Sequence, residues 1–186
     1  MGGSPLVRIC VFCGSQPGRS QRYAAAAAET GKLLAKRGIT LVYGGASVGT
    51  MGTIADAALE AGGEVVGVIP TSMVDRELAH QGLTELHVVA SMHERKALMA
   101  ELSDGFLALP GGAGTLDELF EIWTWAQIGL HRKPIGIVDT DGFYQPLVEM
   151  VDHMVIEGFI RPGYRDFISV DSDPAKLLDK FAAEQN

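Results

Sequence analysis

The sequence predicts an α/β fold, a single Rossmann-like, doubly wound domain over residues 1–186 with a mainly parallel sheet of about seven strands. Short apolar runs alternate with longer helical patterns along the whole chain. The runs are continuously apolar, as in VVGVIP, FLALP and IGIV, which is typical of strands covered on both faces. A chain with 47% hydrophobic residues can bury a substantial core, and only its last few residues are expected to be disordered.

Each expected strand is one of these apolar runs. In order, strands are expected at Val7–Cys13, Thr40–Tyr43, Glu64–Ile69, Leu86–Val89, Gly105–Leu109, Pro134–Val138 and Phe167–Val170. Helices are expected between them, near residues 20–37, 51–61, 92–103, 115–128, 143–157 and 174–183. This alternation predicts right-handed βαβ units in an open parallel sheet. Ligands of such sheets bind beyond the carboxyl ends of the strands, where the chain order reverses.

The charge and the terminal sequence exclude several classes of protein. A formal net charge of -8 without a long basic run argues against a general nucleic-acid binder. The same charge is compatible with a small anionic ligand, because backbone amides and one or two arginines can hold a phosphate in an acidic protein. The N-terminal MGGSPLVR lacks an apolar signal region, and no apolar run reaches membrane-spanning length. We therefore expect a soluble cytoplasmic protein that does not bind membranes.

The cysteines and histidines do not predict a metal site. Cys10 and Cys13 have C-x-x-C spacing, but they lie on or just after an expected strand, and no second pair completes a zinc site. We expect two reduced cysteines in the core or at the edge of a site. The five histidines show no metal-ligand spacing and no nucleophile partner. Neither a metal nor a cofactor is expected.

Three glycine-bearing segments follow three of the expected strands: CGSQPG at 13–18, YGGASVGTMG at 43–52 and LPGGAGTLDE at 109–118. All three should lie at the same edge of the sheet. Glycine lets a phosphate approach the backbone, and the following helix N-terminus offers free N–H groups. The sequence has neither the G-x-G-x-x-G dinucleotide fingerprint after the first strand nor a G-x-x-x-x-G-K-[ST] phosphate loop. These segments therefore predict a phosphate site, but not that of a dehydrogenase or a P-loop NTPase.

Two interpretations are open for the acid in the last segment. Thr115 and Glu118 have the T-x-x-E spacing of a capping box, which would make Glu118 a structural residue of the helix start. Alternatively, Glu118 is a carboxylate of the site. Glu118, Glu121 and Trp125 fall opposite the apolar stripe of this helix, so they are expected to face the cleft or a partner chain. Ser15, in the first segment, is a ligand donor or a helix-entry hydroxyl.

A second helix start lies in SMHERKALMAEL, residues 91–102. Ser91 and Glu94 again have capping-box spacing. Arg95 falls near the centre of the expected buried stripe and near the positive end of the helix dipole, where a cation is unfavourable. An anion at the strand edge would offset this cost; the alternatives are an arginine that extends to solvent or pairs with a structural acid. Lys96 is either a site residue or a solvated surface lysine.

These residues resemble a known family. The motif M-x-x-R-K at 92–96, followed by P-G-G-x-G-T-x-x-E at 110–118, resembles the LOG family of cytokinin riboside 5′-monophosphate phosphoribohydrolases, often mislabelled lysine decarboxylases. The resemblance extends from C-G-S at 13–15 through Y-G-G at 43–45 to W-x-Q-x-G at 125–129. It implies a homodimer that hydrolyses the N-glycosidic bond of N6-modified adenosine 5′-monophosphates and AMP, and that releases free base and ribose 5-phosphate.

The resemblance also implies roles for individual residues. Arg95 and Glu118 correspond to the catalytic pair. The implied substrate-binding residues are Ser15, Gly44, Gly45, Glu77, Met92, Lys96, Gly111, Gly112, Ala113, Gly114 and Thr115. The sequence departs from the family pattern at Ala46, where a third glycine is usual, and at Thr50, where leucine is usual. It also departs at Ala113, where a bulky residue is frequent.

Three other functions are weighed against this one. Lysine decarboxylation needs pyridoxal phosphate on a Schiff-base lysine, and no lysine here lies in a motif for it. A non-catalytic nucleotide sensor or carrier could share the fold. A general nucleoside 5′-monophosphate glycosidase is the third alternative, because no sequence feature reads the N6 substituent.

Overall fold

The computed structural model describes residues 6–74 and 78–184. Glu77, one of the expected substrate-binding residues, and residues 185–186, where disorder was expected, lie outside the described residues. Within the described part of the chain, no helix is both long enough and apolar enough to cross a membrane.

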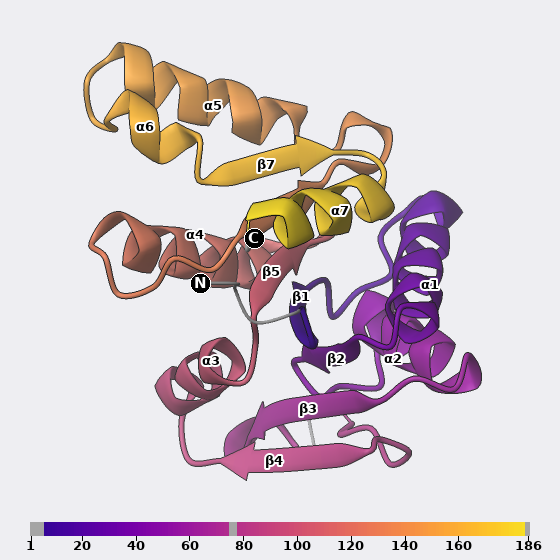
Figure 1. Cartoon of the computed structure of the whole chain (residues 1–186). Coiled ribbons are helices and arrows are strands. Elements are labelled where there is room, and N and C mark those ends of the chain that lie inside the picture. The colour runs from indigo at the N-terminus through magenta and orange to yellow at the C-terminus, as the bar shows by residue number, and fades with distance from the viewer. Residues whose placement is uncertain (1–5, 75–77, 185–186) are drawn as a thin grey trace.

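One parallel sheet of seven strands forms the centre of the molecule, in the order β4-β3-β2-β1-β5-β6-β7 (Figure 1). The strands are β1 Arg8–Phe12, β2 Thr40–Tyr43, β3 Val65–Pro70, β4 Glu85–Val89, β5 Gly105–Ala108, β6 Ile135–Val138 and β7 Ile168–Asp171. The predicted α/β class, the parallel sheet and the strand positions are confirmed.

The helices follow the strands as the alternation predicts. They are α1 Gln21–Lys36, α2 Gly49–Glu60, α3 Met92–Glu101, α4 Ala113–Gln127, α5 Gln145–Ile156, α6 Pro162–Arg165 and α7 Pro174–Glu184, with short 3₁₀ turns η1 Thr71–Met73 and η2 Thr140–Gly142. Only α6 and the two turns were not expected. Each is three or four residues long, which is too short to carry a helical period.

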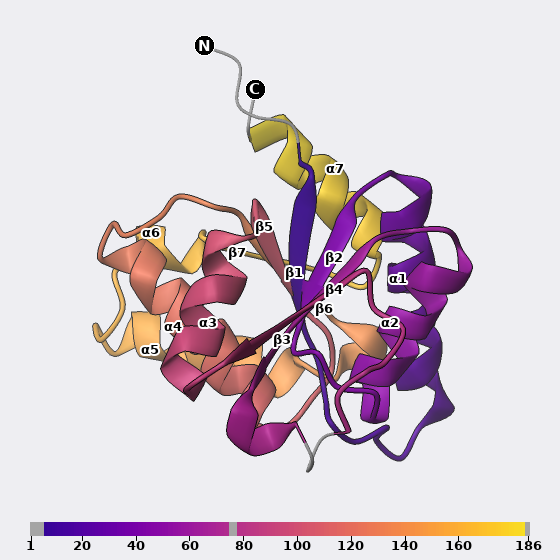
Figure 2. The same ribbon diagram turned by 90° about the horizontal axis from the view of Figure 1, so that it is seen from below.

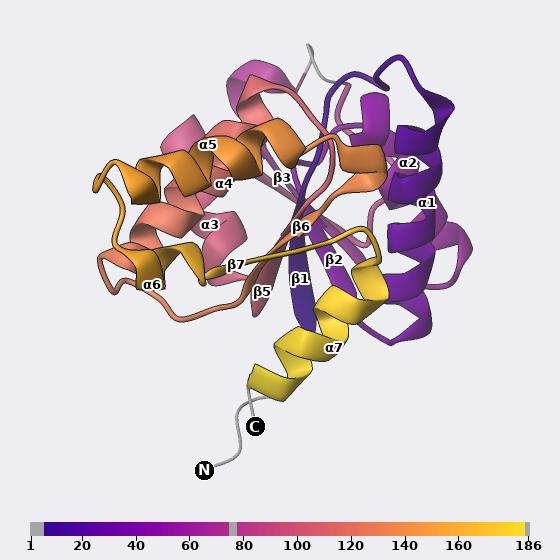
Figure 3. The same cartoon turned by 90° about the horizontal axis from the view of Figure 1, so that it is seen from above.

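The helices cover both faces of the sheet (Figures 2 and 3). Helices α1, α2 and α7 lie on one face, and α3, α4 and α5 lie on the other. Along β1 the side chains alternate between two cores: Ile9 and Val11 pack in the first, and Cys10 and Phe12 pack in the second. Burial on both faces explains why the strand runs are continuously apolar, since each buried Ile or Val contributes about 1.5–3 kcal/mol.

Strand β4 is the exception to coverage on both faces. It is an edge strand, and Leu86 and Val88 are 36% and 54% exposed. The expectation of a fully covered strand is therefore wrong for β4. Its neighbour β3, by contrast, is buried along its whole length.

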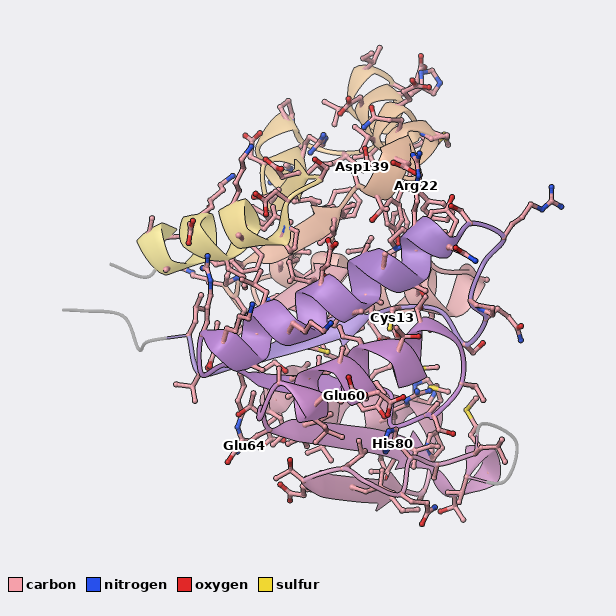
Figure 4. All side chains as sticks on the ribbon, turned by 90° about the vertical axis from the view of Figure 1, so that its right-hand side faces the viewer. Cys13, Arg22, Glu60, Glu64, His80 and Asp139 are labelled. Carbon is pink, nitrogen blue, oxygen red and sulfur yellow. The ribbon has the colours of Figure 1, made fainter. Side chains whose placement is uncertain are left out.

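The chain order reverses between β1 and β5, which are neighbours in the sheet. From β1 the strands proceed in one direction to β4, and from β5 in the other direction to β7. The crevice for a ligand is therefore expected beyond the carboxyl ends of β1 and β5. Figure 4 labels residues at both ends of the strands. Cys13 and Asp139 directly follow the carboxyl ends of β1 and β6 and lie toward one side of the molecule. Glu64 directly precedes the amino end of β3 and lies toward the other side.

Candidate active site

Helix α4 begins at Ala113, two residues before the predicted start at Thr115. The N-cap is Gly112, with extended backbone at φ −95° and ψ −157°, and no side chain caps the helix. The backbone N–H of Leu116 donates to the Gly112 carbonyl at 3.2 Å. Thr115 is thus the third helical residue, and of the two interpretations of Glu118 the capping box with Thr115 is wrong.

The Thr115 side chain is buried beside the cavity at this helix start. The residue is 3% exposed, and its Oγ1 has no hydrogen-bond partner among the described residues. Gly111 makes room for it, because a Cβ at position 111 would lie 2.1 Å from Thr115 Oγ1. A Cβ at Gly112 or Gly114 would meet nothing within 4 Å. The glycines of this segment therefore divide into one that accommodates Thr115 and two that border open space.

The start of α3 agrees with its predicted cap. Ser91 is the N-cap, and its Oγ accepts from the Glu94 backbone N–H at 3.2 Å. The Glu94 carboxylate turns back and accepts from the Ala90 N–H at 3.0 Å. This cap fixes the first turn of α3 and places Arg95 just behind it, on the side that faces the sheet.

Arg95 is 4% exposed, so the alternative in which it extends to solvent is wrong. Its Nε donates to the carbonyl of Val68 at 3.0 Å, and its Nη2 donates to the carbonyl of Gly44 at 2.8 Å. Its Nη1 lies 3.7 Å and 3.9 Å from the sulfurs of Met92 and Met73. Backbone carbonyls from the residue after β2 and from within β3 thus hold the guanidinium in one position.

The end of β2 is shaped around Arg95. A Cβ at Gly44 would lie 2.1 Å from Arg95 Nη2, so this glycine leaves space for the guanidinium. Gly45 has a positive φ of 76°. Ala46 is fully buried, pairs with Ala79 in an isolated antiparallel bridge and accepts from the Tyr43 hydroxyl at 2.9 Å. The alanine methyl group is thus accommodated in the core at this turn.

A cavity of about 240 Å³ lies at this edge of the sheet. It is lined by Cys13, Gly14, Ser15, Met51, Met73, Met92, Arg95, Gly112, Ala113, Gly114, Thr115, Asp117 and Glu118. Its size is near the lower end of the range for small-molecule sites, roughly 300 Å³. The cavity thus combines a basic side chain, Arg95, two carboxylates, Asp117 and Glu118, and a helix N-terminus.

Most residues expected in the site from the sequence lie at this cavity. The exceptions among the described residues are Gly44, Gly45, Gly111 and Lys96, which do not line it. Gly44 and Gly111 lie directly behind Arg95 and Thr115, as their contacts show.

Lys96 joins α3 to α4. Its Nζ lies 3.0 Å from Asp117 and 3.1 Å from Glu121, and its side chain is 10% exposed. Partial burial opposes its charge, but the two carboxylates raise the pKa of Lys96 above its ordinary value. Lys96 is therefore not a solvated surface lysine; it contacts Asp117, which lines the cavity.

Sequence reasoning did not place Gly14, Met51, Met73 and Asp117 at the site. Gly14 and Met51 lie in the first and second glycine segments, so their nearness to those loops was the available signal. Met73 comes from η1, far along the chain, and only the fold brings it near. With Met51 and Met92 it gives the cavity an apolar, polarisable wall.

Cys13 lines the cavity, whereas Cys10 packs in the core on the other face of the sheet. Burial raises the pKa of the Cys13 thiol to about 12; the Thr50 hydroxyl and Arg95 act against the shift, and Glu118 adds to it. Both thiols are free, in agreement with the expectation of two reduced cysteines in the core or at the edge of a site. Among the described residues no group of three His, Cys, Asp or Glu side chains could hold a metal ion.

A larger hollow of about 580 Å³ lies at the amino ends of β6 and β7, bordered by Gly129, by residues 131–134 and by Asp166 and Phe167. Neither Arg95 nor Glu118 contributes to it. Its Lys133 Nζ is already bound to the Ala100 carbonyl at 2.7 Å. The edge with the switch point, the helix N-terminus and the two charged residues is therefore the candidate active site.

The fold and the site together define a class: a Rossmann-like protein with a helix N-terminus, an arginine and a carboxylate at the same cavity. Comparison with known proteins identifies the family. Residues 51–181 match the family described as "possible lysine decarboxylase". The chain belongs to this family, which is the LOG family of the predicted resemblance.

The names of curated relatives agree with this family. A cytokinin riboside 5′-monophosphate phosphoribohydrolase of Rhodococcoides fascians is 52% identical over 166 residues, which are 89% of this chain and 84% of that protein. The phosphoribohydrolase LOG3 of Arabidopsis thaliana is 48% identical over 180 residues, 97% of this chain and 83% of that protein. A solved molybdenum cofactor carrier protein from Chlamydomonas reinhardtii has a TM-score of 0.69 at 24% identity, covers 97% of each chain, and shows a shared fold.

Proposed function

We propose that this protein hydrolyses the N-glycosidic bond of N6-modified adenosine 5′-monophosphates, and of AMP, to free base and ribose 5-phosphate. The observation that carries the proposal is that one cavity holds the start of α4, with the buried Thr115 hydroxyl, together with the Glu118 carboxylate and the Arg95 guanidinium. The names of relatives at about 50% identity support the same activity.

The arrangement separates the phosphate from the carboxylate. The first N–H groups of α4 and the Thr115 hydroxyl are suited to the 5′-phosphate, since a helix N-terminus favours anions. Glu118 is three residues further along the helix, a rise of about 4.5 Å. The phosphate of a nucleotide is several bonds from its anomeric carbon. The helix start can therefore hold the phosphate while Glu118 addresses the ribose.

Glu118 acts on the sugar in this proposal. Cleavage of an N-glycosidic bond develops positive, oxocarbenium-like charge on the ribose, as in glycoside hydrolysis. A carboxylate beside the ring stabilises that charge and can orient or deprotonate the attacking water. The water's oxygen bonds to the anomeric carbon, and the bond to the base nitrogen breaks with a proton delivered to the base.

Arg95 orients the nucleotide and offsets negative charge near Glu118. Its guanidinium is permanently charged, and the carbonyls of Gly44 and Val68 fix it before substrate binds. The proposal also includes five substrate-binding residues that do not line the cavity or lie outside the described residues: Gly44, Gly45, Gly111, Lys96 and Glu77. For Gly44 and Gly111 the contacts favour an indirect role, in which they hold Arg95 and Thr115 in place.

The test is product analysis by chromatography after incubation with AMP and, separately, N6-isopentenyl-AMP. We expect free base and ribose 5-phosphate in equal amounts, and the ratio of the two rates measures the contribution of the N6 group. Glu118→Gln should abolish turnover while nucleotide binding persists. Glu121→Gln is the matched control, since Glu121 lies on the same helix but pairs with Lys96 outside the cavity.

Three outcomes would contradict the proposal or a part of it. Intact nucleotides after long incubation with folded protein would favour the non-catalytic sensor or carrier. Near-normal turnover in Glu118→Gln would remove Glu118 from the mechanism. Equal cleavage of AMP, GMP and CMP would instead indicate a general nucleoside 5′-monophosphate glycosidase.

We also propose that the protein is a cytoplasmic homodimer. Large apolar side chains are exposed at the ends of α4 and α5: Ile128 at 65%, Leu130 at 67%, Ile156 at 79% and Phe159 at 86%. Figures 1 and 3 show the segments after these two helices on the same side of the molecule. An apolar surface of this kind supports association. Trp125, expected on this face, is half-buried against the core.

Light scattering after size-exclusion chromatography tests the assembly, with a dimer expected for the wild type. Phe159→Asp should shift the protein toward monomer, and a wild-type monomer would reject the dimer. Two free, buried thiols are compatible with the reducing cytoplasm.

A further inference from the structure

Thr50 lies in the first turn of α2, and it is 2% exposed. Its Oγ1 accepts from the backbone N–H of Gly14 at 2.9 Å and donates to the Gly14 carbonyl at 3.1 Å. The next residue, Met51, donates its own N–H to the same carbonyl at 3.2 Å. Both backbone polar groups of Gly14 are therefore bound to the start of α2.

Gly14 is the middle residue of the cavity wall formed by residues 13–15. A Cβ at Gly14 would lie 3.0 Å from the Gln16 carbonyl oxygen and 3.5 Å from the Cα of Gly111. The segment is thus packed between α2 and the loop that leads into α4. A shift of Gly14 would move one wall of the cavity relative to the helix start that bears Thr115.

We propose that Thr50 is a positioning residue for the substrate, because its hydroxyl fixes the segment 13–15 as the wall against which the nucleotide binds. The inference rests on the proposed function. An aliphatic side chain at position 50 could make neither bond to Gly14, and the Met51 N–H would then be the remaining link from the start of α2 to this glycine.

The kinetic test compares Thr50→Val, which keeps the shape and removes the hydroxyl, with Thr50→Ser, which keeps the hydroxyl. Thr53→Val is the matched control, since among the described residues the Thr53 hydroxyl bonds only to the Gly49 carbonyl within α2, at 3.2 Å, and Thr53 does not line the cavity. The substrate is N6-isopentenyl-AMP.

We expect Thr50→Val to raise KM about tenfold with kcat nearly unchanged, because a buried donor loses its partner while Arg95 and Glu118 lie on other elements. Thr50→Ser and Thr53→Val should stay within about twofold of wild type. An unchanged KM in Thr50→Val would overturn the proposal. So would a fall in kcat alone, or a failure of Thr50→Ser to restore KM.

Hydrogen exchange of backbone amides tests the positioning without any activity. In the wild type, the Gly14 amide should exchange more than about tenfold more slowly than that of Arg19, an exposed residue whose N–H donates to no group among the described residues. In Thr50→Val, exchange of the Gly14 amide should become faster, while the amide of Val11 in β1 should stay protected.

Fast exchange of Gly14 in the wild type would overturn the proposal even if Thr50→Val does not fold. If the wild-type protein cleaves no nucleotide, the proposed function fails, and the exchange of Gly14 still decides whether Thr50 fixes the segment.

Discussion

Gly44→Ala adds one methyl group at the end of β2, and the structure predicts that this group displaces the Arg95 guanidinium. A Cβ at position 44 would lie 2.1 Å from Nη2 and 3.2 Å from Cζ of Arg95, and 2.9 Å from the sulfur of Met51. The Gly44 carbonyl itself accepts from Nη2 at 2.8 Å. Gly44 is not among the glycines with positive φ, so the steric contact rather than backbone strain dominates the effect.

The expected magnitude follows from the hydrogen bond that must lengthen or break. A hydrogen bond to a charged group contributes about 1.5–3 kcal/mol to the free energy of unfolding. For a chain of this size, each kcal/mol changes the melting temperature by about 2–4 °C, so we expect a decrease of roughly 3–12 °C. If the same free energy is lost in the transition state, kcat/KM falls about 10- to 100-fold.

Thermal unfolding and steady-state hydrolysis of N6-isopentenyl-AMP measure the two effects on the same preparations. Gly163→Ala is the control, since a Cβ at this α6 position meets nothing within 4 Å. Its melting temperature and kcat/KM should match those of the wild type. If Gly44→Ala matched the wild type as well, Arg95 would have moved without cost. The conclusion that the Gly44 carbonyl positions Arg95 would then be wrong.

Three further predictions concern buried polar groups. The Thr115 Oγ1 has no hydrogen-bond partner among the described residues. Thr115→Val should therefore leave the free energy of unfolding, measured by urea denaturation, equal or about 1 kcal/mol higher. The same substitution should weaken nucleotide binding, measured by calorimetry. If Thr115→Val bound the nucleotide as tightly as the wild type, the role of the Thr115 hydroxyl in binding would be refuted. Ellman's reagent at about pH 7.5 should detect neither Cys10 nor Cys13 before unfolding, because burial raises the pKa of both thiols. Burial lowers the pKa of His131, so the folded ring favours its neutral form. Stability should therefore fall as pH drops below about 6.5, and less so in His131→Gln.

The fold was predictable because its signals are local. VVGVIP and FLALP are apolar without interruption, and both are buried strands, β3 and β5. The edge position of β4 could not be read in the same way, because ELHVV resembles a buried strand and its exposure depends on sheet order.

The site was predictable as a set of loops, but the function of individual glycines was not. Gly44 and Gly111 are explained by side chains that enter from elsewhere, Arg95 from α3 and Thr115 from the next turn of chain. Spacing also suggested the wrong helix start at Thr115. Gly112 can adopt the extended N-cap conformation without a capping side chain, and T-x-x-E spacing carries no information on that backbone choice.

The groups of the site are positioned by the protein itself before any nucleotide binds. Backbone carbonyls hold Arg95, and Gly111 makes room for Thr115. Preorganised charges and dipoles stabilise a transition state without reorganising during the reaction. The same construction lowers stability, because a buried Thr115 hydroxyl that makes no hydrogen bond within the described chain destabilises the fold by about 1–3 kcal/mol. A residue kept only for packing would not retain that hydroxyl. The predicted opposite effects of Thr115→Val on stability and on binding therefore distinguish a site for an anion from an ordinary helix start.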